Sequence, residues 1–228
     1  MQWHNLLFMH WPLPPQVLRP LIPAPLHLDT FDGAAWIGIV PFQMCGVTAR
    51  LVPPMPGLSA FCELNVRTYV TIGGKPGVWF FSLDAANGPA VRAARLAFHL
   101  PYYDARMRCL MDGRNIRYSS LRTHRLAPPA AFGASYHPIG PPAFARPGTL
   151  EDWLTARYCL YAANRRGKAW RGEIDHAPWP LQPAEVELER NTMIAPIRIV
   201  LPSVAPLLHF ARRLDVVAWN PEVVRGPV

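Results

Sequence analysis

The chain has 228 residues, 50% of them apolar and only 17% charged, which excludes a disordered or coiled-coil protein and suits one domain over residues 1–228. The 27 prolines, more than twice the usual share, favour short strands and ordered loops over long helices. Lysine and arginine outnumber aspartate and glutamate by 23 to 15, so the chain is basic. No apolar run approaches the roughly 20 residues that cross a bilayer, so no membrane partner is expected.

The first half of the chain predicts one helical turn and three strands. Apolar runs bounded by proline, glycine and aspartate indicate where these elements begin and end. The expected elements are a helical turn at Gln16–Leu21 and strands at Ala34–Phe42, Phe61–Ile72 and Gly77–Leu83. Gly73-Gly74 separates the last two strands, so residues 61–84 are predicted to form a long antiparallel hairpin.

The second half mixes further strands with two helices. Asn87–Leu100 suits a helix that Asn87 caps, and Pro202–Leu214 suits a final helix. Strands are expected at Ala105–Leu110, Asn115–Leu121, Leu154–Ala162, Trp170–Ile174, Val186–Met193 and Asp215–Ala218. The interval 127–148 holds six prolines and three glycines and is expected to be a loop. The predicted class is α+β, mainly an antiparallel sheet or barrel with a few short helices.

The basic excess is concentrated in residues 91–125. This interval holds eight arginines against Asp104 and Asp112. Such a cluster can mark nucleic-acid binding, but proline and apolar residues interrupt it, and no helix-turn-helix or RNA-binding motif accompanies it. We therefore expect no specific nucleic-acid partner.

The cysteines and histidines do not form a metal-binding motif. The four cysteines, at positions 45, 62, 109 and 159, contain no CxxC pair, and the eight histidines show no ligand spacing. No metal and no other cofactor is expected. The N-terminal segment lacks a basic region and a cleavage site, so we expect no signal peptide and a cytoplasmic location, where cysteines stay reduced.

Polar and aromatic residues share one face of the strand predicted over Phe61–Ile72. Glu63, Arg67 and Tyr69 fall on this face, whereas the alternate residues are apolar and suit a core. Glu63 and Arg67 are four residues apart, about 13 Å along an extended strand, so no direct salt bridge is expected. A carboxylate, a guanidinium and a phenol inside a barrel would suit a small polar or anionic ligand. A solvated face with cross-strand aromatic pairs is the alternative.

Two further segments pair histidine with tryptophan. They are His10-Trp11 and the run HAPW at 176–179. Packing explains a tryptophan beside proline, and a place in a pocket is the alternative.

Longer motifs in the chain are similar to those of the YqjF-like family of uncharacterised bacterial proteins, which is structurally akin to acetoacetate decarboxylase. The motifs are DTFDGAAWIGIVPF (29–42), FCELNVRTYV (61–70), KPGVWFFSLDA (75–85), ARLAFHLPYYDARM (94–107) and RGEIDHAPWPLQPAE (171–185). The resemblance covers nearly the whole chain. It implies a largely antiparallel β-barrel or cone with a central cavity and small flanking helices.

The resemblance also bears on the chemistry. The decarboxylases react through a lysine Schiff base beside a second lysine. The matching positions here hold Tyr102 and Tyr103, and a phenol cannot form an imine. Glu63 matches one cavity carboxylate of those enzymes, whereas the other falls near Gly38. The resemblance therefore implies a cavity without Schiff-base chemistry.

Two functional hypotheses follow. The first is a barrel that binds a small carboxylate or aromatic compound; its candidate ligand-binding residues are Glu63, Arg67, Tyr69, Tyr102 and Tyr103. The second is a lysine-independent enzyme in which Tyr102 or Tyr103 acts with Glu63 as acid and base on a carbonyl or keto acid. Tyr103 is the expected partner if Asp104 faces solvent, because neighbours on a strand alternate faces. A homo-oligomer and a scaffold role remain open.

Overall fold

The structure is a computed structural model that describes residues 1–47, 59–88, 92, 95, 99–164 and 168–224. Strands dominate the described residues, and the helices are short. The helical elements are α1 (Pro15–Leu18), η1 (Arg19–Leu21), α3 (Leu150–Thr155) and η2 (Ala195–Ile197). The strands are β1 (Gln2–Leu13), β2 (His27–Leu28), β3 (Ala35–Cys45), β4 (Phe61–Ile72), β5 (Lys75–Ala85), β6 (Tyr102–Asp112), β7 (Asn115–Arg122), β8 (Ala131–Pro138), β9 (Cys159–Ala163), β10 (Ala169–His176), β11 (Gln182–Asn191), β12 (Leu207–Ala218) and β13 (Glu222–Val224).

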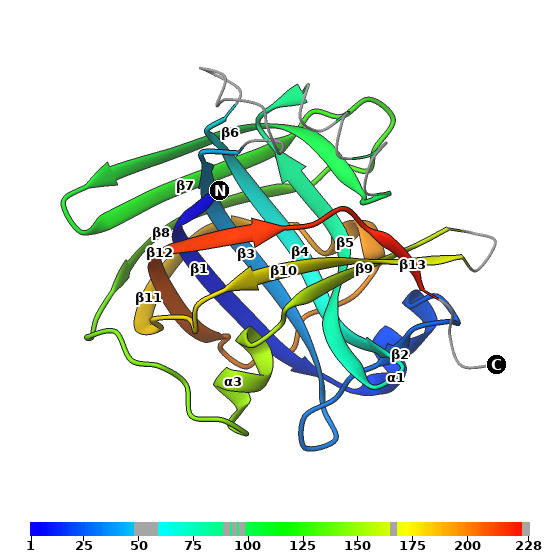
Figure 1. Ribbon diagram of the computed structural model, residues 1–228. Helices are drawn as coiled ribbons and strands as arrows, with labels where there is room; N and C mark the ends of the chain where they lie inside the picture. Colours follow the sequence, from blue (N-terminus) through cyan, green and yellow to red (C-terminus); the bar gives the residue numbers. More distant parts are fainter. Residues whose placement is uncertain (48–58, 89–91, 93–94, 96–98, 165–167, 225–228) are drawn as a thin grey trace.

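Nine of the described strands close into a barrel. Their order is β5-β6-β7-β8-β11-β12-β1-β3-β4, and the pairing of β4 with β5 closes the ring. Every pair in this ring is antiparallel except β5 with β6, which is parallel. The expected α+β class, with a mainly antiparallel barrel and few short helices, is confirmed (Figure 1).

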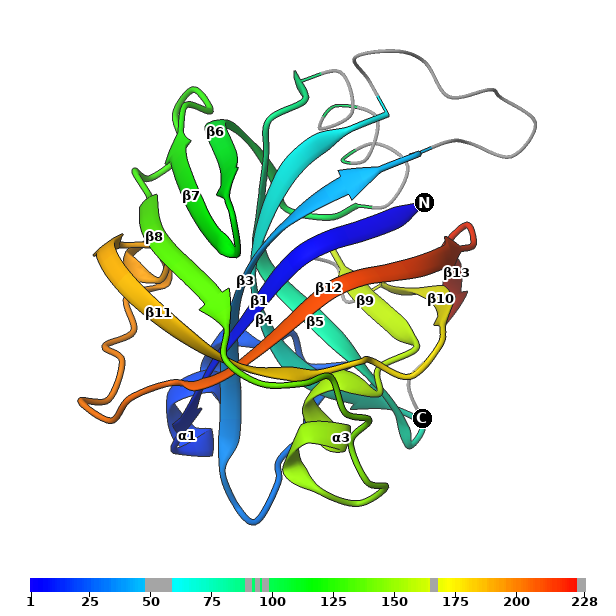
Figure 2. The same cartoon turned by 90° about the vertical axis from the view of Figure 1, so that its left-hand side faces the viewer.

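A second ring shares five strands with the barrel. β9 runs parallel to β5 at Val78 and Trp79, and β10 pairs both with β9 and with the end of β12. β9 and β10 therefore lie in front of β5, β4, β3 and β1, with the end of β12 beside β10, as Figure 1 shows. In Figure 2 the two lobes lie on either side of the shared strands. We call the enclosure formed by β9, β10 and the five shared strands the second ring.

The interior of the nine-stranded barrel is filled by apolar side chains. One cluster from β1, β3, β4, β7 and β8 occupies it, and each of its core residues is at most 8% exposed. Tyr118 and Tyr136 are part of this cluster, and their hydroxyls donate to backbone carbonyls. The barrel interior is therefore a packed core, and the polar residues of interest must face elsewhere.

The predicted hairpin over residues 61–84 is confirmed. β4 and β5 pair antiparallel from Glu63–Ala85 to Ile72–Lys75, with the turn at Gly73 and Gly74. Both turn glycines have positive φ, a conformation that glycine adopts without the clash a side chain would cause.

The predicted final helix over Pro202–Leu214 is wrong, because this segment contains most of the long strand β12. β12 pairs with β1 over most of its length and also with β10 and β11. Its apolar residues alternate between two clusters, with Leu208 and Phe210 facing the barrel and Ala211 facing the second ring. A short apolar run fits both the helical and the strand periodicity. The segment is a strand because it pairs with neighbouring strands.

Three other expectations need correction. The strand expected over Leu154–Ala162 begins only at Cys159, because Thr149 caps helix α3 before it. The interval 127–148 contains β8, which pairs with β7 and β11. No element was expected over Gln2–Leu13, which forms the central strand β1. The expected turn at Gln16–Leu21 and the other strands are confirmed.

The helix expected over Asn87–Leu100 is described only in part. Gly88, Arg92 and Arg95 are helical, whereas residues 89–91, 93–94 and 96–98 lie outside the described residues. Within the described chain, no helix has the length and apolar character needed to cross a membrane.

Candidate functional site

The polar face of β4 is buried inside the second ring. Glu63 is 3% exposed, Asn65 5% and Tyr69 0%, while Arg67 between them is half-buried. The opposite face of the strand packs into the barrel core through Leu64 and Val66. The alternative of a solvated face is therefore wrong. Burying these polar groups costs free energy, and a role in ligand binding would explain why they are buried.

Glu63 forms a buried pair with Tyr102. The hydroxyl of Tyr102 donates to Oε2 of Glu63 over 3.1 Å. Burial raises the pKa of Glu63 to about 8, although the hydrogen bond from Tyr102 acts in the opposite direction. Burial also raises the pKa of Tyr102 well above its usual value. At neutral pH the pair is mostly uncharged and can both donate and accept a hydrogen bond.

Tyr103 does not reach this pair, so the expectation that Tyr103 accompanies Glu63 is corrected. Tyr102 and Tyr103 point to opposite sides of β6, as neighbours on a strand do. The ring of Tyr103 lies 4.2 Å from the guanidinium carbon of Arg122. Arg122 in turn forms a buried ion pair with Asp84, with 2.6 Å between Nη2 and Oδ1. Tyr103 therefore belongs to a packing arrangement on the barrel side.

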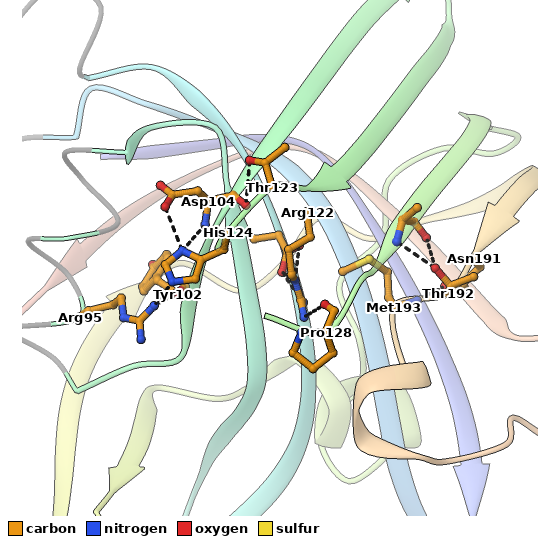
Figure 3. A network of polar contacts seen from close by, with 12 residues as sticks. Arg95, Tyr102, Asp104, Arg122, Thr123, His124, Pro128, Asn191, Thr192 and Met193 are labelled. Atoms are coloured by element: carbon orange, nitrogen blue, oxygen red, sulfur yellow. Dashed lines mark hydrogen bonds and ion pairs between the residues drawn. The ribbon is translucent and has the colours of Figure 1, made fainter. Parts of the chain in front are cut away.

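A polar network surrounds the start of β6 (Figure 3). Arg95 donates to the carbonyl oxygen of Tyr102 and contacts Nε2 of His124 over 2.8 Å. Nδ1 of His124 lies 2.9 Å from Oδ2 of Asp104. Asp104 is thus held by an imidazole and is not simply turned to solvent. The network fixes the backbone from which Tyr102 projects toward Glu63.

Arg67 has no counter-ion among the described residues. Its guanidinium carbon lies 5.2 Å from the centre of the Phe8 ring and 5.7 Å from that of Tyr69. Its Nε is buried and has no hydrogen-bond partner there. Glu63 and Arg67 form no salt bridge, as their spacing on the strand predicted. A half-buried guanidinium between two aromatic rings is well suited to bind an anion.

His10 is a part of this site that the sequence analysis did not include among its candidates. Its Nε2 is hydrogen-bonded to the Tyr69 hydroxyl over 2.7 Å, and burial lowers its pKa well below the usual value. Gly38 makes room for it, because a Cβ at that position would lie 2.9 Å from Cδ2 of His10 and 3.4 Å from Cγ of Arg67. The pair His10-Trp11 was visible in the sequence, but packing was the simpler interpretation of it.

The end of the second ring near Tyr69 is closed by α3 and the residues after it. Trp153 of α3 contacts the ring of Tyr69 at 4.9 Å. The guanidinium carbon of Arg157 lies 4.9 Å from the same ring, and Arg157 forms an ion pair with Asp29 over 2.6 Å. The ring of Tyr69 therefore lies near two guanidinium groups, those of Arg67 and Arg157.

The other histidine–tryptophan segment packs on the far side of Phe8, whose ring Trp179 contacts at 4.9 Å. His176 packs between the rings of Tyr158 and Trp179, at 4.8 and 5.3 Å. Its Nδ1 contacts the carbonyl oxygen of Ala177 over 2.8 Å. Packing is the role that these contacts support.

The two lysines lie outside the second ring's polar face. Nζ of Lys75 is 2.7 Å from Oε2 of Glu173 in a partly exposed ion pair. Lys75 stands opposite Ile72, nine residues along β4 from Glu63, which corresponds to roughly 30 Å. Lys168 is exposed, with Nζ 5.2 Å from the ring centre of Trp170.

No group of three or more potential metal ligands occurs among the described residues. Two surface hollows, of about 630 and 420 Å³, are lined by other residues. The larger is bordered by Arg114, His137 and Glu185, and the smaller by Phe144, Pro178 and Arg213. The unpaired buried atoms around Arg67 therefore remain the strongest indication of a binding site.

Comparisons with known proteins confirm the resemblance seen in the motifs. The sequence profile of the DUF2071 family, described as an uncharacterized conserved protein, matches residues 1–215. The uncharacterized protein YqjF of Bacillus subtilis (strain 168) is 47% identical over 217 residues, which cover 95% of this chain and 88% of YqjF.

Solved structures with the same fold are enzymes. The enduracididine biosynthesis enzyme MppR in complex with pyruvate matches with a TM-score of 0.63 and 12% identity, covering 98% of this chain and 90% of MppR. Acetoacetate decarboxylase of Legionella pneumophila matches with a TM-score of 0.59 and 14% identity, covering 99% of this chain and 88% of the enzyme. At these identities the likeness concerns the fold, which is that of acetoacetate decarboxylase.

Proposed function

Because this chain belongs to the DUF2071 family and has the fold of acetoacetate decarboxylase, we propose that it binds a small organic anion inside the second ring, without forming a Schiff base. The anionic group of the ligand is a carboxylate that pairs with Arg67. Glu63, Tyr69 and Tyr102 complete the polar surface around it.

The observation that carries this proposal is the unpaired guanidinium of Arg67. The two strongly buried arginines described, Arg122 and Arg157, each have a carboxylate partner at 2.6 Å. Arg67 has none, and its buried Nε lacks an acceptor. Leaving such a group unpaired is costly unless a ligand or water supplies the acceptor. The pyruvate complex of MppR supports a carboxylate as the anion in this fold.

Calorimetric titration with acetate and pyruvate tests the proposal. Arg67→Met keeps the length and much of the apolar stem of the side chain but removes its charge. We expect this variant to lose roughly 10- to 100-fold in affinity, the value of a charge-assisted hydrogen bond. Arg117→Met, at an exposed position of β7, is the matched control and should bind as the wild type does. Equal affinity in both variants would refute the proposal.

A second candidate function is proton-transfer catalysis by Tyr102 and Glu63. Their 3.1 Å hydrogen bond and the pKa of Glu63 near 8 suit an acid–base pair that works near neutral pH. A keto acid that reaches this pair would exchange the protons next to its carbonyl group with solvent. NMR of pyruvate in deuterated water measures this exchange, and Glu63→Gln should abolish any rate above that of buffer. Exchange that is equally fast with Glu63→Gln would exclude the pair.

We also propose that the protein is cytoplasmic. All four cysteines are described, and none forms a disulfide. Fractionation of cells that express the chain at native level tests the location.

A further inference from the structure

An unpaired acceptor near Arg67 indicates that the ligand carries a hydrogen-bond donor as well as an anionic group. Oδ1 of Asn65 is buried without a hydrogen-bond partner among the described residues, and Asn65 is 5% exposed. Its cross-strand neighbours are Val40 on β3 and Leu83 on β5, whose side chains have no polar atoms. Neither cross-strand neighbour therefore offers this oxygen a donor, and a ligand could supply one.

Asn65 and Arg67 can reach one ligand. They are two residues apart on the same face of β4, about 7 Å between Cα atoms. The guanidinium of Arg67 extends over Phe8, which packs in the same cluster as Val40, the residue opposite Asn65. The unpaired N–H of Arg67 and the unpaired oxygen of Asn65 thus lie on one face of β4, beside the same apolar cluster. A ligand there must accept a hydrogen bond at one end and donate one at the other.

Resting on the proposed function, we propose that the ligand is a small hydroxy acid, whose carboxylate pairs with Arg67 and whose hydroxyl donates to Oδ1 of Asn65. A keto oxygen only accepts hydrogen bonds, so a plain keto acid would leave Asn65 unpaired. An ammonium group would lie close to the guanidiniums of Arg67 and Arg157, with the nearest carboxyl of the strand, Glu63, already bonded to Tyr102. A neutral O–H on carbon 2 or 3 meets both demands.

Three-carbon acids that differ in one group test this inference by calorimetric titration at pH 7. The probes are propionate, pyruvate and lactate, each titrated into the wild type, Asn65→Leu and Arg67→Met. We expect lactate to bind the wild type about tenfold more tightly than propionate or pyruvate, because only lactate satisfies the buried oxygen. In Asn65→Leu the tenfold advantage of lactate over propionate should disappear.

A ligand-side control covers the case in which Asn65→Leu does not fold. 2-Methoxypropanoate keeps the oxygen of lactate but lacks its O–H donor, and it should bind the wild type no better than propionate. Equal affinity of the wild type for lactate and propionate would overturn the hydroxy-acid inference while leaving anion binding intact. If the acids bind equally well to Arg67→Met, or none binds the wild type, the proposed function itself fails.

Discussion

Glu63 is a buried carboxyl group in the second ring, and its protonation state changes near neutral pH. Its pKa is raised from 4.5 to about 8 in the folded protein, mainly by burial. A raised carboxyl pKa means that the folded state favours the protonated form. The resulting stabilisation is complete below the unfolded-state pKa and is lost as pH rises through the folded-state value.

The first prediction therefore concerns stability against pH. Between pH 4.5 and 8 the contribution of Glu63 to the free energy of unfolding should fall as pH rises, by up to about 1.4 kcal/mol per pH unit. Urea unfolding at several pH values measures it. Glu63→Gln should lack this contribution, and Glu187→Gln, at an exposed position of β11, should retain it. Identical slopes in the wild type and Glu63→Gln would contradict the assignment.

The second prediction concerns the missing imine. Incubation with acetoacetate and borohydride should leave the mass of the protein unchanged. The reason is that Tyr102 and Tyr103 offer no amine, while Lys75 is engaged with Glu173 and Lys168 is exposed. Mass spectrometry decides the matter. A covalent adduct at either lysine that disappears on Lys→Arg substitution would show that Schiff-base chemistry occurs.

The candidate site could be predicted only in part from the sequence. The strict alternation along Phe61–Ile72 placed Glu63, Arg67 and Tyr69 on one face, and this is how the strand is built. His10 could not be placed, because its position depends on β1 lying beside β3 and on the absence of a side chain at Gly38. Asn65 alternates onto the same face, but only the structure shows that its oxygen is unpaired.

At the scale of elements, the β4–β5 hairpin follows from local sequence patterns, whereas β12 depends on pairing with a distant strand. The β4–β5 hairpin has its turn glycines and its alternation within one continuous segment, so it was predictable. β12 has a pattern that fits a helix equally well, and its partner β1 lies some two hundred residues earlier in the chain. Such non-local pairs leave no signature in a short window of sequence.

The third prediction belongs to the contact that joins β5 to β7 across the barrel. Asp84 and Arg122 form an ion pair whose side chains are 0% and 2% exposed. Asp84→Asn leaves the guanidinium buried without a counter-charge and should lower the free energy of unfolding by about 3–5 kcal/mol. Asp215→Asn breaks the exposed pair with Arg213 and should change it by less than about 0.5 kcal/mol. Equal effects in chemical denaturation would contradict the role of burial.

At the scale of the whole molecule, the two rings are joined by the strands that they share. β5, β4, β3, β1 and β12 pack apolar residues into the barrel on one face and line the second ring on the other. Neither enclosure can lose these strands without exposing the core of the other. The site around Arg67 therefore depends on the integrity of both lobes (Figure 2).

The fourth prediction follows from this shared wall. We propose that residues 1–228 are one domain, and unfolding by urea should be a single cooperative transition. Intrinsic tryptophan fluorescence reports on eight tryptophans, which include Trp11 in the barrel core and Trp153 and Trp179 at the second ring. Far-ultraviolet circular dichroism reports on all strands. Both signals should change with the same midpoint. Two separate midpoints would show that the rings unfold independently.

The central claim is that Arg67 binds the carboxylate of a small acid inside the second ring. A crystal structure determined after soaking with lactate tests it most directly, because it locates the ligand atoms. We predict a carboxylate within hydrogen-bond distance of Nε of Arg67, with the hydroxyl toward Asn65. Crystals in which lactate is bound elsewhere, or in which Arg67 is engaged by another part of the chain and no ligand approaches it, would contradict the account.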